Sequence, residues 1–252
     1  MIDIEIEDGI AVVTLKHGKA NALDIELCEA LAARFMELRK SNAKAVVITG
    51  QGKIFSAGVN LIKLSEGGAD YIRKFLPALH GLYDAVFYQP KPVVAAINGH
   101  AIAGGCVLAC CADRRVMAND GGRIGVTELL VGVPFPALAF EIMRHTTSPY
   151  FFSETMLSGA TFSADAAARR GWVNEAVEPA VLMERALAVA QSLAALSPPA
   201  FAQTKKQIRA NVATRFEHSG EATDKTATEI WTAPETLTYI RDYVARTLKK
   251  KN

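Results

Sequence analysis

Apolar and acidic residues alternate strictly at the start of the chain, over Ile2–Glu7, and a mostly apolar run follows over Ile10–Leu15. The pair Asp8-Gly9 between them is typical of a two-residue hairpin turn. The pattern then changes to helical spacing, with an apolar face that continues to about Lys40. Asp24, at its start, is a residue type that caps helix N-termini. The first forty residues therefore predict a β-hairpin followed by an amphipathic helix.

Strand-like and helix-like patterns alternate through the middle of the chain. Apolar runs typical of buried strands occupy residues 45–49, 92–97 and about 113–118, with a further short stretch at 123–126. Helical patterns lie between and after them, at 69–87, 104–111, 137–144, 150–157, 163–170 and 179–196. Such alternation is typical of an α/β core.

The pattern changes at Ser197-Pro198-Pro199, the clearest boundary in the sequence. Everything beyond it is helical in pattern and predicts helices at about 199–213, 216–231 and 234–249. Their apolar faces must be covered by the core or by a neighbouring subunit. We therefore divide the chain into an α/β core, residues 1–196, and a C-terminal helical region, residues 197–252.

Composition narrows the function classes. The chain has 252 residues, of which half are apolar and 21% charged, and its net charge is +2 with both signs interspersed. This is an ordinary globular composition without the basic footprint of a nucleic-acid-binding protein. The start lacks the basic region of a secretory signal, and no uncharged run approaches the roughly 20 residues that cross a bilayer. We expect a cytoplasmic protein with no nucleic-acid or membrane partner.

Cysteines and histidines show no metal-binding pattern. Cys106, Cys110 and Cys111 crowd one apolar helix, where they serve as small hydrophobic residues, and Cys28 stands alone. Four of the histidines have no cysteine or carboxylate at a spacing that suggests a metal: His17, His80, His145 and His218. The sequence predicts no metal site, and a reducing compartment fits the free cysteines.

Two small-residue turns carry the candidate chemistry. The strand at 92–97 ends at Asn98-Gly99, and Gly104-Gly105 opens the apolar helix that follows. Backbone N–H groups are unpaired at a helix N-terminus, where they suit an anion or a developing oxyanion. Upstream, the strand at 45–49 leads through a similar turn into Phe55–Leu61. Two such turns can aim two N–H donors at one carbonyl oxygen, although glycines also fit a helix packed close against a strand.

These segments resemble the crotonase superfamily in order and spacing. Phe55–Leu61 resembles its motif of an aromatic residue, two small residues, glycine, any residue, aspartate and an apolar residue. Ala96–Cys106 resembles its second signature, and Lys19–Asp24 the early segment that lies along coenzyme A in that family. Later segments agree too: Leu157–Gly159, Phe162–Ala164, Ala168–Val173 and Asn174–Val177. The resemblance covers about residues 1–250.

The resemblance implies a fold, a substrate class and an assembly. The fold is a spiral of ββα units followed by a helical region that covers the active site and serves trimerisation. The substrate is an acyl-CoA thioester, with no cofactor beyond its own CoA moiety. The partner is a further copy of the chain, in a homotrimer or a dimer of trimers.

The resemblance also implies site residues. The backbone N–H groups of Val59 and Gly104 correspond to the family's oxyanion hole, and Glu128 to the residue that moves protons beside the thioester. From the residues alone, Glu128 is equally a surface carboxylate at a helix start. The strip along coenzyme A maps onto Lys19, Ala20, Ala22, Ala57, Asn60, Leu61 and Ile62, with Asn60 in place of the usual aspartate. His100 is expected either in the acyl pocket or packed under its turn.

One departure bears on the reaction. Hydratases of the resembled family carry a second glutamate two residues beyond the last glycine, where this chain has Val107. A single carboxylate suffices to move a proton between two carbons, whereas hydration also needs a held water. The pattern is therefore closest to a Δ3,Δ2-enoyl-CoA isomerase. The alternatives are an enoyl-CoA hydratase, a lyase or hydrolase of another CoA thioester, and a non-catalytic CoA-thioester-binding subunit, against which Glu128 argues.

Overall fold

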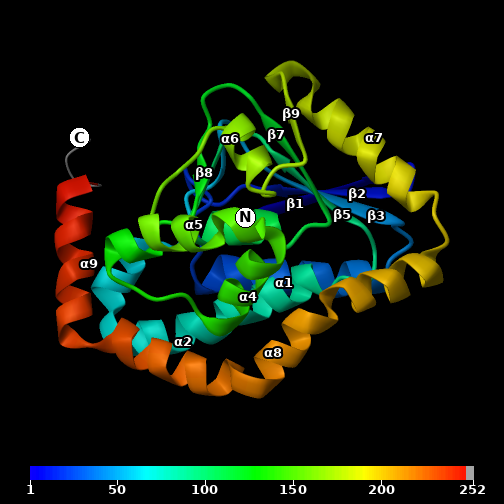
Figure 1. Cartoon of the computed structure of the whole chain (residues 1–252). Helices are drawn as coiled ribbons and strands as arrows, with labels where there is room; N and C mark the ends of the chain where they lie inside the picture. The colour runs from blue at the N-terminus through cyan, green and yellow to red at the C-terminus, as the bar shows by residue number, and fades with distance from the viewer. Residues whose placement is uncertain (248–252) are drawn as a thin grey trace.

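A computed structural model describes residues 1–247, which fold into two β-sheets with helices around them (Figure 1). The larger sheet has the strand order β1-β2-β3-β5-β7-β9, and the smaller has the order β4-β6-β8. β1 (Ile2–Glu7) and β2 (Ile10–Leu15) pair antiparallel as the predicted hairpin. Every later neighbour in both sheets is parallel.

Each turn of the chain gives one strand to each sheet. β3 (Ala45–Gly50), β5 (Val93–Ile97) and β7 (Arg114–Ala118) lie side by side in the larger sheet. The strands that directly follow them form the smaller sheet: β4 (Ile54–Ser56), β6 (His100–Ile102) and β8 (Ile124–Gly125). β9 (Glu175–Val177) completes the larger sheet beside β7. This arrangement confirms the predicted spiral of strand–strand–helix units.

Helices bury both faces of the larger sheet. The main core holds the inner faces of α1 (Ile25–Lys40), α2 (Leu61–Phe87) and α3 (Gly104–Cys110), and a second core lies between the sheet and α7 (Leu182–Ala194). Shorter helices complete the region: α4 (Ala137–Thr146), α5 (Phe152–Ser158), α6 (Ala164–Arg169) and the 3₁₀ turns η1 (Glu128–Val131), η2 (Pro149–Phe151) and η3 (Pro179–Val181).

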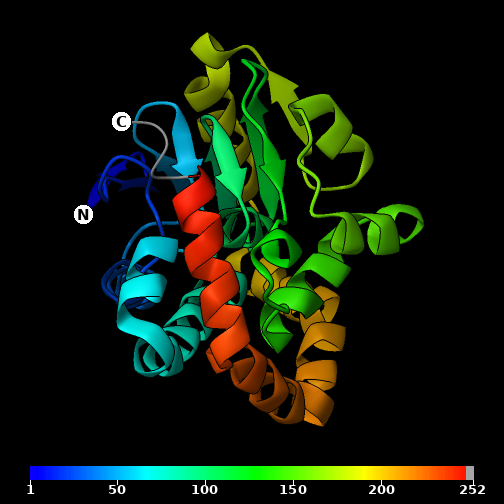
Figure 2. The ribbon, with the colours of Figure 1, turned by 90° about the vertical axis from the view of Figure 1, so that its left-hand side faces the viewer.

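The C-terminal region differs from its prediction. One continuous helix, α8 (Pro198–Thr232), replaces the two helices expected at 199–213 and 216–231, because no glycine or proline interrupts it between them. α9 (Pro234–Thr247) follows, and the predicted extension to 249 lies outside the described residues. α8 packs along α4 and α2, and α9, red in Figure 2, packs beside α2 and η1.

The start of α2 also differs from its prediction. The helix begins at Leu61 rather than at residue 69, and Asn60 caps it by accepting a hydrogen bond from the Lys63 N–H. Gly68 interrupts it with φ 59° and ψ −151°, which is why the helical periodicity becomes regular only beyond this residue.

None of the described helices is by itself long and apolar enough to cross a membrane; η3–α7 and α8 pass that test only together, as a pair bent by 104°.

Candidate active site

The smaller sheet brings the three candidate segments to one edge. β4 leads into Val59, β6 into Gly104 and β8 into Glu128. The strands are parallel neighbours, with Ser56 opposite Ala101 and Ile102 opposite Gly125. Because the carboxyl ends of parallel strands meet at the same edge of a sheet, the residues that follow them lie close together.

Two glycines let the first two segments touch through their backbones. Gly58 has φ +81°, and a Cβ on it would lie 2.4 Å from the Ile102 carbonyl oxygen. A Cβ on Gly105 would lie 2.6 Å from the Ser56 carbonyl oxygen. Real Cβ atoms do not come so close, so any larger residue at either position would push the two segments apart. This contact places Val59 directly beside Gly104.

The two peptides that carry the candidate N–H donors are each oriented by hydrogen bonds to their carbonyl oxygens. The Gly58 carbonyl oxygen, in the peptide that carries the Val59 N–H, accepts a hydrogen bond from the Leu23 N–H at 2.7 Å. The Ala103 carbonyl oxygen, in the peptide that carries the Gly104 N–H, accepts from the first turn of α3 at 2.8 and 3.2 Å. Among residues 1–247, neither the Val59 N–H nor the Gly104 N–H donates to a protein acceptor. Two oriented peptides thus present free N–H groups at one place.

Ala103 adopts an unusual backbone conformation, with φ 50° and ψ −125°, at the N-cap of α3. An alanine in this region is strained. Its N–H donates to the Gly125 carbonyl oxygen at 2.7 Å, at the end of β8, and this bond helps to hold the turn. The strain therefore lies in the turn that orients the Gly104 N–H.

Glu128 is a buried carboxyl group and the first residue of η1, with 6% of its surface exposed. Burial raises its pKa to about 7, and hydrogen bonding from the backbone N–H groups of Glu128 and Thr127 lowers it only in part. Its Oε2 has no hydrogen-bond partner within the described chain, and no charged side chain there contributes to the shift. A group that is half ionised near neutral pH can both take and return a proton.

The surroundings of Glu128 are apolar or weakly polar. Val107 is buried in the first turn of α3. Tyr83 on α2 and Cys106 on α3 are also buried, and the charge of Glu128 helps to raise the pKa of each. Sequence reasoning missed Tyr83, because it lies on the apolar stripe of α2, where an aromatic residue indicates core packing.

The predicted coenzyme A strip is brought together on the surface. The loop of residues 19–24 runs beside 57–60, with hydrogen bonds from Ala57 N–H to Ala20 O at 2.9 Å and from Asn60 N–H to Leu23 O at 2.8 Å. The predicted strip residues are exposed or half-buried: Lys19, Ala20, Ala22, Ala57, Asn60, Leu61 and Ile62. No ion pair holds Lys19 within the described part of the chain.

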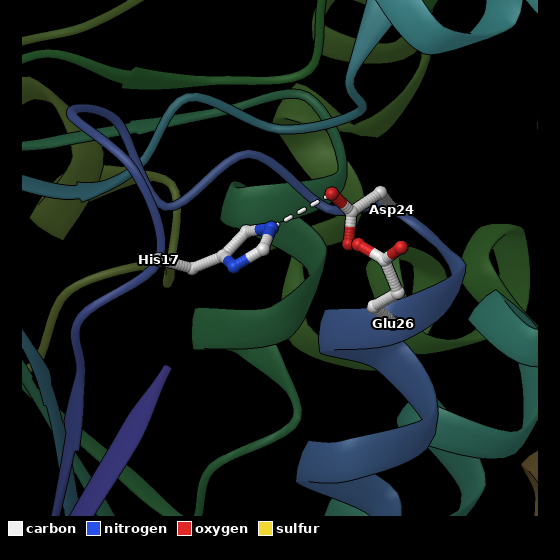
Figure 3. Close-up of side chains that lie close together, drawn as sticks. All are labelled: His17, Asp24 and Glu26. Atoms are coloured by element: carbon white, nitrogen blue, oxygen red, sulfur yellow. Dashed lines mark hydrogen bonds and ion pairs between the residues drawn. The ribbon is translucent and has the colours of Figure 1, made fainter.

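An ion cluster pins the end of this loop (Figure 3). His17 Nε2 lies 2.7 Å from Asp24 Oδ2, and Glu26 completes a group whose ligand atoms lie within 4.8 Å of one another. The Lys63 ammonium already bridges the two carboxylates, at 3.0 Å from Asp24 and 2.7 Å from Glu26. Asp24 also caps α1 by accepting from the Leu27 N–H at 2.9 Å. The cluster therefore ties the loop to the starts of α1 and α2.

His100 is exposed at the amino end of β6, where its Nδ1 accepts a hydrogen bond from the Arg123 N–H at 3.2 Å. Its expected packing under the turn is wrong. Because the chain runs through the strand before it reaches Gly104, the ring lies at the opposite end of β6 from the two free N–H groups.

Comparisons with known sequences agree with this geometry. A sequence model of the family described as Enoyl-CoA hydratase/isomerase matches residues 5–236. A putative enoyl-CoA hydratase from Thermus thermophilus is 33% identical over 213 residues, which cover 82% of this chain and 83% of that protein. A carnitinyl-CoA dehydratase from Salmonella typhi is 34% identical over 203 residues, which cover 80% of this chain and 77% of that protein.

Comparisons with solved structures support the same family. A protein from Mycobacterium tuberculosis, named an enoyl-CoA isomerase in one solved structure and a probable enoyl-CoA hydratase in another, aligns in the first with a TM-score of 0.81 and 32% identity, over 89% of this chain and 97% of that one. Human mitochondrial Δ3-Δ2-enoyl-CoA isomerase shares the fold, with a TM-score of 0.93 and 23% identity, over 100% of this chain and 99% of that one. The fold is that of the crotonase superfamily. Within it, the chain belongs to the enoyl-CoA hydratase/isomerase family of enzymes.

Proposed function

We propose that this protein is an enoyl-CoA isomerase, which moves the double bond of a 3-enoyl-CoA thioester to position 2. The observation that supports the proposal most strongly is the environment of Glu128. This residue is one buried carboxyl with a pKa of about 7 and a free oxygen, and no charged side chain among residues 1–247 contributes to that pKa. The relative from Mycobacterium tuberculosis is named an isomerase in one structure and a probable hydratase in another, so the proposal depends on Glu128 and Val107 rather than on that name.

In the proposed reaction the Glu128 carboxylate takes a proton from C2 of the substrate. The electron pair of that C–H bond delocalises onto the thioester oxygen, which gives a dienolate. The free N–H groups of Val59 and Gly104 stabilise the negative oxygen, and donors aimed at developing charge are usually the largest catalytic contribution. Glu128 then returns the proton to C4, and the double bond lies between C2 and C3. The substrate and the product are isomers, with the same atoms and the same oxidation state, so the reaction needs no cofactor beyond the CoA moiety.

The CoA moiety is proposed to lie along the strip of the 19–24 loop and residues 57–62. Lys19 is exposed, and its ammonium is available for a phosphate group. Because the strip includes residues on both sides of Val59, a ligand on it would place its thioester beside the two free N–H groups.

An enoyl-CoA hydratase is the second candidate, and the names of two relatives favour it. Hydration requires a water that is held and activated beside C3. Val107, at the position of the second glutamate of the family's hydratases, offers no acceptor for that water. We therefore expect isomerisation to be the faster reaction.

The test is turnover of 3-enoyl-CoA and 2-enoyl-CoA esters of several chain lengths by the purified protein. Isomerisation should outrun hydration at every length that is turned over. Glu128→Gln should lose roughly 10²–10⁴-fold in rate, as expected for a general acid–base, while affinity for the CoA ester stays within a few-fold. Faster hydration would make the protein a hydratase. A wild type without turnover that still binds the esters would make it a binding subunit.

A further inference from the structure

Tyr83 presents the only phenol that contacts the candidate oxyanion site within the described residues. It lies on α2 with 1% of its surface exposed, and its hydroxyl donates a hydrogen bond to the Gly104 carbonyl oxygen at 3.0 Å. The hydroxyl also lies 2.8 Å from the position that a Cβ on Gly104 would occupy. The phenol therefore bonds to the Gly104 carbonyl and occupies the space that a side chain at this position would need.

Apolar packing alone does not account for this hydroxyl. The neighbours of Tyr83 on the buried side of α2 are Leu79, Leu82 and Val86, and a phenylalanine would fill the same space. A buried hydroxyl loses its hydration and needs a partner. The Gly104 carbonyl supplies that partner, so the interaction specifically joins α2 to the first turn of α3.

The bond adds a side-chain restraint to a turn that is otherwise held by backbone hydrogen bonds and packing. Gly104 has no side chain to anchor it, and α3 is a helix of seven residues. The peptide on its amino side is fixed through the Ala103 carbonyl oxygen, which accepts two N–H groups of α3. Tyr83 fixes the peptide on its carboxyl side. Together the two interactions set the direction of the Gly104 N–H.

The helix α2 is therefore connected to both candidate donors, to Val59 through the chain and to Gly104 through Tyr83. α2 begins at Leu61, directly after Val59 and its cap Asn60, and its buried middle carries Tyr83. Burial and the neighbouring charge of Glu128 raise the pKa of Tyr83 well above its ordinary value, so the hydroxyl keeps its proton and remains a donor while Glu128 ionises.

We propose that Tyr83 is a positioning residue: its hydroxyl holds the Gly104–Gly105 peptide and so restricts rotation about the Gly104 backbone, which keeps the Gly104 N–H pointed at the thioester oxygen of the substrate. This inference rests on the oxyanion hole of the proposed function and holds equally for isomerisation and hydration, since both pass through charge on that oxygen. Tyr83 itself makes no contact with the reacting atoms.

The test compares Tyr83→Phe with Tyr88→Phe, which removes a hydroxyl from the end of the same helix, where that hydroxyl makes no hydrogen bond within the described chain. The direct readout is the infrared carbonyl band of a saturated acyl-CoA, labelled with ¹³C at the thioester carbon and bound to each protein. We expect the wild type and Tyr88→Phe to shift this band to lower frequency than in solution, and Tyr83→Phe to lose a large part of the shift. With a substrate that is turned over, kcat of Tyr83→Phe should fall about 10-fold with KM within about 2-fold, the size of one lost hydrogen bond.

The outcomes separate the two proposals. If the wild type shifts the band and Tyr83→Phe shifts it equally with unchanged kcat, Tyr83 has no positioning role and the oxyanion hole stands. If Tyr83→Phe lowers only the melting temperature, the role is structural and the inference is overturned. If the wild type shifts the band but turns over no enoyl-CoA, the proposed reaction fails while the role of Tyr83 is still decided by the band. If the wild type gives no shift, both the oxyanion hole and the role of Tyr83 are rejected.

Discussion

Glu128 links the activity of this protein to pH. Burial raises its pKa to about 7, so the group is mainly protonated below that value and cannot accept a proton. If it is the base, kcat/KM for a 3-enoyl-CoA should rise as the pH increases through about 7 and level off above it, because this profile reports the ionisation of the free enzyme. A profile that is flat between pH 5.5 and 8.5 would contradict this assignment.

The same residue links stability to pH in the opposite direction. Glutamate ionises near 4.5 in the unfolded chain, and Glu128 ionises near 7 in the folded one. The buried neutral carboxyl therefore contributes its full share to the free energy of unfolding below pH 4.5, and this contribution is lost as the pH rises through 7. Each pKa unit corresponds to about 1.4 kcal/mol, so the loss is on the order of 3 kcal/mol at pH 8. Urea unfolding should therefore find Glu128→Gln more stable than the wild type at pH 8 and nearly equal to it at pH 4. Equal stabilities of the two proteins at pH 8 would show that ionised Glu128 does not destabilise the fold.

At the residue scale, the resemblance to the crotonase superfamily supplied the candidate donors and the candidate base, and nothing in the sequence indicated Tyr83 or the backbone at Ala103. Val59, Gly104 and Glu128 were predicted because they match motif positions of that superfamily, whereas the residues alone showed only glycine turns and a carboxylate that could equally lie on the surface. Tyr83 does not stand out, because a phenol on an apolar stripe has the pattern of core packing. The positive φ of Ala103 was equally invisible, since an alanine gives no sign of an unusual backbone conformation.

At the element scale, the site depends on two chain segments that meet through glycine. In Gly58→Ala the new Cβ would lie 2.4 Å from the Ile102 carbonyl oxygen at a φ of +81°. Overpacking of this kind costs roughly 1–3 kcal/mol, and the shift would separate Val59 from Gly104. We expect a lower melting temperature and a kcat reduced by at least ~10-fold.

Gly81→Ala is the matched control for this change. Gly81 lies inside α2, and a Cβ on it would meet nothing within 4 Å. The substitution should stabilise the protein by up to about 1 kcal/mol, because alanine favours helix over glycine, and should leave kcat unchanged. Full activity in Gly58→Ala would show that the approach of the two segments is not needed.

The helices and the longer strands were predictable, and the shortest strands mostly were not. The hairpin, α1 and strands β3, β5 and β7 are long enough to show a period or an apolar run, whereas β9 has three residues and was not predicted. β4 and β6 have three residues each, too few for any periodicity, and only β8 falls in a predicted stretch, 123–126; yet these three strands bring the site together. The continuity of α8 was missed because the β-branched Thr214 weakens the helical pattern without breaking the helix, which tertiary packing stabilises.

At the scale of the whole molecule, buried ion pairs join the C-terminal region to the core. Asp113, just before β7, contacts Lys205 at 2.6 Å and Arg209 at 2.7 Å, both on α8, and accepts from the Val93 N–H at 2.8 Å. Removing one side of such a cluster leaves charge buried without its partner, which is strongly destabilising. A chain truncated after Pro198 should therefore be insoluble or poorly folded when expressed. A soluble truncated core with a cooperative unfolding transition would contradict this.

The predicted trimer is the remaining property of the whole molecule. Apolar side chains stay exposed near the start of α8: Leu196 at 51%, in the turn from α7, and Ile208 at 59%, on α8 itself. Ile208 lines a cavity of about 340 Å³ together with Leu193 and Phe201. A neighbouring copy that covered this surface would remove its apolar area from water. Because three chains of 27.1 kDa make about 81 kDa, light scattering at micromolar concentration should give that mass or twice it.

Substitution at this surface tests its place in the assembly. Ile208→Glu should shift the mass toward 27.1 kDa, because a buried unpaired carboxylate at an interface is costly. Ile6→Glu changes an isoleucine that is 54% exposed on β1, the edge strand of the larger sheet, and should leave the mass unchanged. A wild type of 27.1 kDa would reject the trimer. An Ile208→Glu protein of full mass would leave the trimer in place and reject this surface as its interface.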